Sequence, residues 1–200
     1  TRSGSVTGVQ TCALPIFAFG CASNADAFMP SPNQFTYFQG GGFDMSFLSF
    51  LEVDREGNVN VSKLGKRPYL TAGCGGFVDI TAHARKIVFS GYFEAGAELQ
   101  LTDEALRVAK PGKFPKMVER VEHITFSGRR ARETGQDVLY VTERCVIRLT
   151  DAGLVATEIM PGIDAERDIV AASRGLVAIA PDAEPMPRAL LAPEPMGLSL

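Results

Sequence analysis

The residues best suited to chemistry lie in a glycine-rich segment, Gly73-Cys74-Gly75-Gly76, directly before an expected helix over residues 77–86. Glycines let the backbone approach a ligand closely, and the N–H groups at the start of a helix favour negative charge. Such a loop can bind a phosphate or form an oxyanion hole, but a tight strand-to-helix turn without a ligand fits equally well. Its spacing is neither GxGxxG nor GxxxxGK[ST], so it does not indicate a nucleotide site.

Glu143 is a second candidate, because it lies between two apolar stretches at 138–141 and 145–149. A buried carboxylate must be paired with a cation or hydrogen-bonded. Arg144 is the nearest cation in the sequence and is therefore the expected partner of Glu143.

The histidines and cysteines indicate no site of their own. His83 and His123 are forty residues apart, and no Cys or carboxylate cluster lies around either at metal-ligand spacing. We expect them on the surface or at helix ends, and we predict no metal ion. Cys145 is expected to be buried in a strand, and no GxSxG motif is present.

The elements that would position these residues are short strands mixed with short helices, which favours an open α/β fold. The pattern predicts strands over residues 35–39, 59–61, 87–93, 99–101, 106–108, 138–141, 145–149 and 154–159. A buried helix or turn is expected over residues 44–51. Asp164 is the expected N-cap of a short helix that ends at Ala172.

Composition excludes several classes of protein. Hydrophobic residues make up 46% and charged residues 22% of the 200, which is ordinary for a folded domain. The net charge of −3 provides no basic surface for nucleic acid, and no apolar run reaches the length of a membrane span. Four scattered cysteines do not indicate a disulfide scaffold. We therefore expect a cytoplasmic protein without nucleic-acid or membrane partners.

Seven motifs, in chain order, resemble the C-terminal, β-type half of family I coenzyme A transferases. They are GGGFD (40–44), DREGNVNVSK (54–63), GCGGFVDIT (73–81), KIVF (86–89), VEHITFSG (121–128), VLYVTERC (138–145) and EIMPGIDAERD (158–168). The resemblance covers about residues 17–198 and is strongest to the acyl-CoA:acetate/3-ketoacid branch, which acts on acetate or propionate. It implies an α/β fold and a place in the metabolism of short-chain fatty acids or ketone bodies.

The resemblance also implies a mechanism. A glutamate attacks the acyl-CoA to give a mixed anhydride, CoA thiolate then gives a glutamyl-CoA thioester, and a carboxylate reverses the sequence. Each tetrahedral intermediate carries an oxyanion, for which the N–H of Gly76 or Gly75 is the expected donor. Gly73 would permit the turn, Asn60 would line the site, and Glu143 would be a supporting carboxylate. The CoA thioester is a substrate, and no permanently bound cofactor is expected.

The sequence departs from the family at its beginning. The family's nucleophilic glutamate lies in a Glu-x-Gly motif upstream of the segment that matches residues 17–22, and no Glu occurs here before Glu52. Residues 6–16 (VTGVQTCALPI) resemble a sequencing-adapter oligonucleotide read in frame, so we expect 1–16 to be a non-native leader. We assign the role of nucleophile to none of Glu52, Glu56 and Glu94, and we expect this chain alone to be inactive.

Three domains or segments follow from this interpretation: the leader at 1–16, an incomplete CoA-transferase domain at 17–180, and a proline-rich, extended tail at 181–200. The expected partners are an acyl-CoA, a small carboxylate and the α-type half of the same protein, with homo-oligomers in the intact form. Two alternatives remain open at this point. One is a non-catalytic α/β ligand-binding module related to sugar-phosphate isomerases or effector-binding domains, and the other is an inert fragment.

Overall fold

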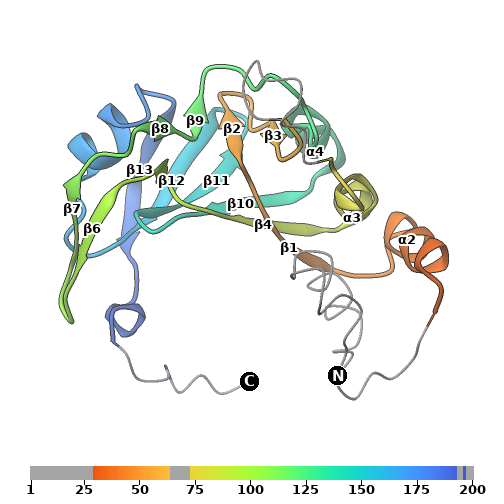
Figure 1. Cartoon of the computed structure of the whole chain (residues 1–200), viewed down its shortest axis with the longest axis horizontal. Coiled ribbons are helices and arrows are strands. Elements are labelled where there is room, and N and C mark those ends of the chain that lie inside the picture. The colour runs from red at the N-terminus through yellow and green to blue at the C-terminus, as the bar shows by residue number, and fades with distance from the viewer. Residues whose placement is uncertain (1–28, 64–72, 193–195, 197–200) are drawn as a thin grey trace.

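A six-stranded sheet forms the centre of the computed structural model, which describes residues 29–63, 73–192 and 196 (Figure 1). The leader expected at 1–16 lies outside the described residues. In spatial order the strands are β1 (Met45–Ser49), β4 (Lys86–Ser90), β10 (Asp137–Val141), β11 (Cys145–Thr150), β12 (Gly153–Ile159) and β13 (Val177–Pro185). β1, β4 and β10 are parallel, β11 is antiparallel to both of its neighbours, and β13 is parallel to β12. The sheet is therefore mixed, and the expected α/β class is confirmed.

Three smaller sheets flank the large one. They consist of β3 (Val59–Asn60), β2 (Glu52–Asp54) and β9 (Met117–Val118); of β5 (Glu94–Ala95) and β8 (Phe114–Pro115); and of the hairpin β6 (Glu98–Leu101) and β7 (Leu106–Lys110). The hairpin lies at one end of the molecule, far from the helices α2, α3 and α4 at the other end (Figure 1).

The described helices are short. They are α2 (Ser31–Gln39), α3 (Phe77–His83), α4 (Gly128–Thr134), the π-helix η2 (Ala165–Ala171) and the 3₁₀-helix η3 (Arg188–Leu190). Ser127 caps α4 by accepting a hydrogen bond from the N–H of Arg130, and Asp164 caps η2 by accepting one from Arg167. The helix predicted after Asp164 is confirmed.

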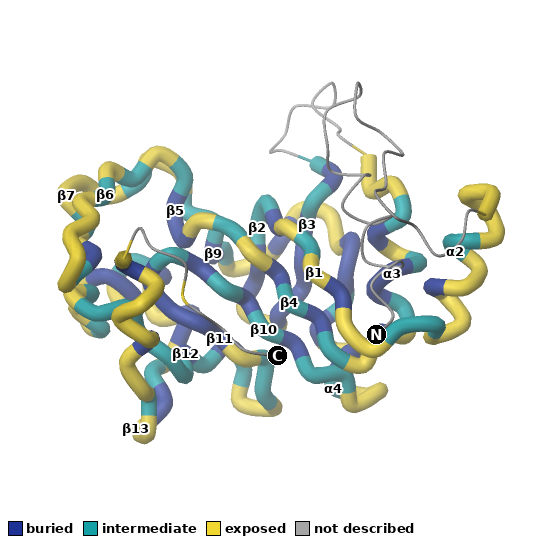
Figure 2. The backbone as a smooth tube through the Cα atoms, turned by 90° about the horizontal axis from the view of Figure 1, so that it is seen from below, coloured by how far each residue is buried: buried dark blue, intermediate teal, exposed yellow. Residues whose placement is uncertain are grey.

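Aromatic rings form the middle of the core. Phe89 on β4 stacks on Tyr140 of β10 and on Phe77 of α3, with ring centroids 5.5 and 5.7 Å apart, and meets Phe126 edge-on at 5.0 Å. The buried hydroxyl of Tyr140 donates to the carbonyl of Gly57 at 2.6 Å, and burial raises its pKa. Buried positions concentrate on the central strands, whereas exposed ones dominate α2 and the β6–β7 hairpin (Figure 2). Burial alternates along β4 and β10, so this aromatic core packs on one face of the parallel strands.

Two predicted elements are wrong. Residues 35–39 belong to helix α2, because Pro32 starts a helix and places Phe35 and Phe38 on one face, where their rings meet edge-on. Residues 45–49 form strand β1, which pairs with β4 at the edge of the sheet. Phe47 is 60% exposed there, so the apolar run at 44–51 belongs to the outermost strand of the described sheet and not to a buried helix.

The other predicted elements agree better with the structure. The helix after Gly76, the 99–108 hairpin and the strands within 138–159 are confirmed. The tail expected from residue 181 is extended at its start, but residues 181–185 are the end of β13 and pair with β12 through Glu158–Glu184 and Ile159–Pro185. The sheet therefore continues past the expected end of the domain.

Candidate active site

The carboxyl ends of three parallel strands meet at one edge of the large sheet. Ser49, Ser90 and Val141, the last residues of β1, β4 and β10, are in register. Gly91 follows β4 and donates its N–H to the carbonyl of Val141 at 3.1 Å, and a Cβ at Gly91 would lie 3.0 Å from the ring of Phe50. In open α/β sheets, ligands bind outside the carboxyl ends of the strands. This edge is therefore the expected location of a ligand-binding or catalytic site.

Glu143 lies at this edge because β10 and β11 are joined by a short connection that contains Glu143-Arg144. Thr142 closes it by donating its N–H to the carbonyl of Cys145 and by accepting the N–H groups of Arg144 and Cys145 at its hydroxyl. The side chain of Glu143 is 13% exposed. Its Oε2 accepts the N–H of Phe93 at 2.8 Å, and its Oε1 accepts Nε of Arg144 at 3.2 Å. The predicted pairing of Glu143 with Arg144 is confirmed.

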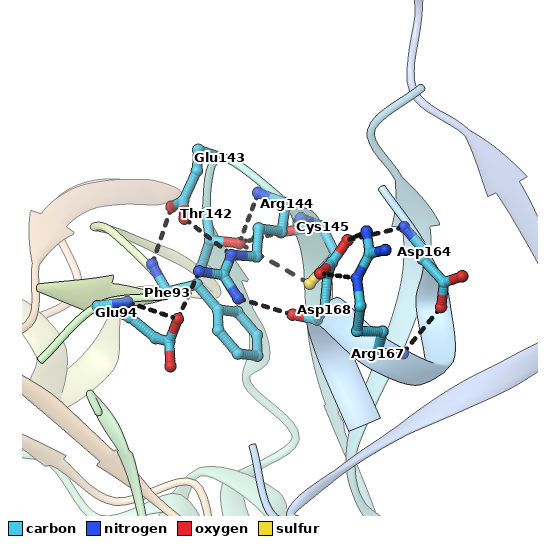
Figure 3. A network of polar contacts seen from close by, with 10 residues as sticks. Phe93, Glu94, Thr142, Glu143, Arg144, Cys145, Asp164, Arg167 and Asp168 are labelled. Atoms are coloured by element: carbon cyan, nitrogen blue, oxygen red, sulfur yellow. Dashed lines mark hydrogen bonds and ion pairs between the residues drawn. The ribbon is translucent and has the colours of Figure 1, made fainter. Parts of the chain in front are cut away.

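A second carboxylate and a second cation lie beside this pair. Glu94, the first residue of β5, accepts Nη2 of Arg144 at 2.6 Å (Figure 3). Lys116 is half-buried and donates to the carbonyl of Phe50 at 3.2 Å, with its ammonium 5.2 Å from the centre of the Phe50 ring. Burial lowers the pKa of the Lys116 ammonium, and the negative charge of Glu143 opposes that shift. Two carboxylates and two cations thus share one edge of the sheet.

The glycine loop has the geometry of a tight, accessible turn. Gly73 and Gly75 have φ angles of 76° and 51°, and no atom lies within 4 Å of a Cβ built at either position. Within the described parts of the chain, the N–H groups of Gly75 and Gly76 have no hydrogen-bond acceptor. A Cβ at Gly76 would lie 2.0 Å from the ring of Phe35, so α2 packs against the start of α3 at this glycine. The loop therefore presents two N–H groups without an acceptor among the described residues, and Gly76 also has a packing role.

Asn60 is completely buried at the end of β3. Its Nδ2 donates to Glu52 Oε2 at 2.8 Å and to the carbonyl of Lys63 at 2.6 Å, while its Oδ1 accepts the N–H groups of Ser62 and Lys63. All of its hydrogen-bonding capacity is used within the chain. The side chain thus fixes the backbone that leads into residues 64–72, which lie outside the described residues.

The structure brings only some of the predicted site residues together. Glu143 joins Glu94, Arg144 and Lys116, but among the described residues no hydrogen bond or ion pair connects Glu143 with the loop at 73–76. The two are linked through the core, because Phe77 directly after the loop stacks on Phe89 of β4. Sequence reasoning missed Glu94 and Lys116; the signal for Glu94 was a carboxylate that follows an apolar strand directly.

The remaining sequence predictions concern metal ligands, histidines and cysteines. No group of three or more His, Cys, Asp or Glu residues able to hold a metal is present among the described residues. His83 ends α3 and His123 is exposed, as expected, and Cys145 is buried in β11. None of the described helices is long and apolar enough to cross a membrane.

The sequence was compared with known proteins. No protein-family model matches it. It is 40% identical to caffeate CoA-transferase of Acetobacterium woodii over 99% of this chain and 38% of that protein. It is 37% identical to acetate CoA-transferase YdiF of Escherichia coli over 100% of this chain and 36% of that protein. The chain therefore spans less than two-fifths of the length of these relatives.

Solved structures of coenzyme A transferases also superpose on this chain. The apoenzyme of the acyl-CoA transferase YdiF from Escherichia coli O157:H7 superposes with a TM-score of 0.84 at 37% identity, over 90% of this chain and 35% of that one. A thioester complex of that protein with CoA superposes with a TM-score of 0.83. Glutaconate coenzyme A-transferase from Acidaminococcus fermentans shares the fold at a TM-score of 0.59 and 14% identity.

Proposed function

Because this chain belongs to the coenzyme A transferases, we propose that it is the β-type part of a longer enzyme that moves CoA between an acyl-CoA and a carboxylate. The observation that carries the proposal is 37% identity combined with a TM-score of 0.84 to an acyl-CoA transferase. The order of the seven motifs supports the β-type assignment. The α-type half would lie in the remainder of the longer protein. These relatives favour an enzyme over a non-catalytic binding module.

The proposed substrates are a short-chain acyl-CoA, of acetyl, propionyl or 3-ketoacyl type, and a small carboxylate. One relative is named for acetate, which supports this choice, and another of similar identity is named for caffeate. Overall sequence identity therefore does not indicate which acid is the substrate. The residues that line the substrate pocket must determine that choice. The CoA thioester is substrate rather than cofactor. The proposal includes a role in short-chain fatty acid or ketone-body metabolism.

The proposed chemistry assigns a separate task to each group of residues. A glutamate outside this chain attacks the acyl carbonyl, CoA thiolate leaves, and the resulting anhydride is attacked by the thiolate to give a glutamyl-CoA thioester and the free acid. The N–H groups of Gly75 and Gly76 would stabilise the oxyanions, and their lack of an acceptor among the described residues supports this role. Glu143 would be the supporting carboxylate, and Asn60 would act indirectly by holding the backbone at 60–63.

Location and assembly are part of the proposal. The thiols of Cys74 and Cys145 are free, which supports a reducing compartment such as the cytoplasm. We propose that the intact protein is a homo-oligomer, for which the exposed Phe47 and Met45 on the edge strand β1 offer apolar surface.

The test is CoA exchange by the intact protein. Incubation with acetyl-CoA and propionate should give propionyl-CoA and acetate, measured by chromatography of the acyl-CoA pool. This 200-residue chain alone should give none, because the nucleophile is supplied from elsewhere. Release of free CoA without a new acyl-CoA would indicate a hydrolase instead. Exchange by the short chain alone would contradict the assignment of the nucleophile.

A further inference from the structure

Arg144 is a buried cation beside the proposed site, with only 1% of its side chain exposed. Burial of an unpaired charge costs several kcal/mol, so such a residue is retained only with close partners. Its guanidinium also lies over the ring of Phe93, with Cζ 4.8 Å from the ring centre. The partners of the Arg144 guanidinium indicate a role beyond stabilising the fold.

The three guanidinium nitrogens contact three different segments (Figure 3). Nη2 donates to Glu94 Oε2 at 2.6 Å, Nη1 donates to the carbonyl of Asp168 at 2.8 Å, and Nε donates to Glu143 Oε1 at 3.2 Å. β5, the π-helix η2 and the β10–β11 connection therefore converge on one side chain. A lysine, with a single nitrogen, cannot reach three acceptors in these directions.

Two of these partners are themselves fixed by other groups. Oε2 of Glu94 also accepts the N–H of Gly112 at 3.1 Å. Asp168 lies in η2, where its carboxylate accepts Nε and Nη2 of Arg167 and the N–H of Asp164. The guanidinium is thus oriented from the interior, and its Nε is directed at the one partner that lies in the β10–β11 connection at the edge of the sheet.

We propose that Arg144 is a positioning residue for the transfer reaction, which holds the carboxylate of Glu143 in one orientation while Glu94 and Asp168 hold Arg144. The inference rests on the proposed function. Among the described residues, Glu143 has two fixed donors, Arg144 Nε and the N–H of Phe93, so loss of the first frees the carboxylate to rotate. Misplacement of a group at an active site by about 1 Å costs on the order of a hundredfold in rate.

The test is a double-mutant cycle on kcat in the intact enzyme. Arg144→Lys and Glu143→Gln should each lower kcat on the order of tenfold or more, with a much smaller change in KM. The double variant should be no slower than the slower single variant, because both changes act through the same carboxylate. Arg148→Lys on the adjoining strand β11, where the arginine pairs with Asp137 away from Glu143, is the matched control and should leave kcat unchanged.

If Arg144→Lys does not fold, Glu94→Gln provides a second test of the same inference. Glu94→Gln weakens the hold on the guanidinium with Arg144 in place, and its loss of kcat should vanish in the Glu143→Gln background. Losses that multiply, or a Glu143→Gln variant with wild-type kcat, would overturn the inference alone. Absence of CoA transfer by the wild-type protein would overturn the proposed function, and this inference with it.

Discussion

Burial determines the chemistry of individual residues, as Cys145 shows. Its thiol is enclosed in the core beside Thr142, and burial raises its pKa from 9.0 to about 12, whereas Cys74 in the glycine loop is exposed. The thiolate is the reactive form, so the buried Cys145 thiol stays protonated and unreactive near neutral pH. In the folded protein, iodoacetamide should therefore alkylate Cys74 and spare Cys145.

Peptide mapping of the alkylated protein checks this prediction. In urea, Cys74 and Cys145 should react alike. Because the pKa of Cys145 is higher in the folded state, the unfolded thiol ionises first, so this thiol lowers the free energy of unfolding as the pH rises above about 9. Equal alkylation of Cys145 in the folded and unfolded protein would contradict the assigned burial.

At the scale of elements, the contact between α4 and the turn after β2 is tight. The N–H of Gly128 donates to Asn58 Oδ1 at 3.0 Å, and a Cβ at Gly128 would lie 2.1 Å from the carbonyl oxygen of Glu56. Gly135 ends the same helix with a φ of 70° and open space around it. Gly128→Ala should therefore destabilise the protein by about 2 kcal/mol or more, because backbone must move. Gly135→Ala should cost only about 1 kcal/mol, from its backbone conformation.

Urea unfolding of the two glycine variants and the parent protein measures both changes. A loss at Gly128 equal to or smaller than the loss at Gly135 would show that α4 does not press against the turn as described.

Elements whose signals are local could be predicted from the sequence, and those set by distant pairing could not. Asp164 as a cap and the alternation in β6 and β7 are local features. β1 is a strand because it pairs with β4, about forty residues away, and nothing within 44–51 indicates that partner. At the site, Glu143 and Arg144 were predicted as a pair because they are neighbours. Glu94 joins them only through the register of β4 with β10.

For the whole molecule, the sequence predicted the class of fold and the family, and the structure supplied the arrangement of the site. The pattern of short strands and helices was enough to predict the fold class, and the order of the seven motifs was enough to predict the family, because both patterns extend over most of the chain. The sheet edge that brings Lys116 to Glu143 depends on three parallel strands ending in register, which composition does not encode. The chain matches little more than a third of its relatives' length, and in the proposed reaction the nucleophile lies outside it.

The location of the covalent intermediate shows whether the nucleophile lies outside this chain. The intact protein is incubated with acetyl-CoA in the absence of an acceptor acid, digested, and searched by mass spectrometry for a peptide that carries CoA on a glutamate. We expect the adduct on a Glu-x-Gly peptide outside this chain, and its loss on treatment with hydroxylamine. An adduct on Glu143, Glu94 or any other glutamate of these 200 residues would contradict it.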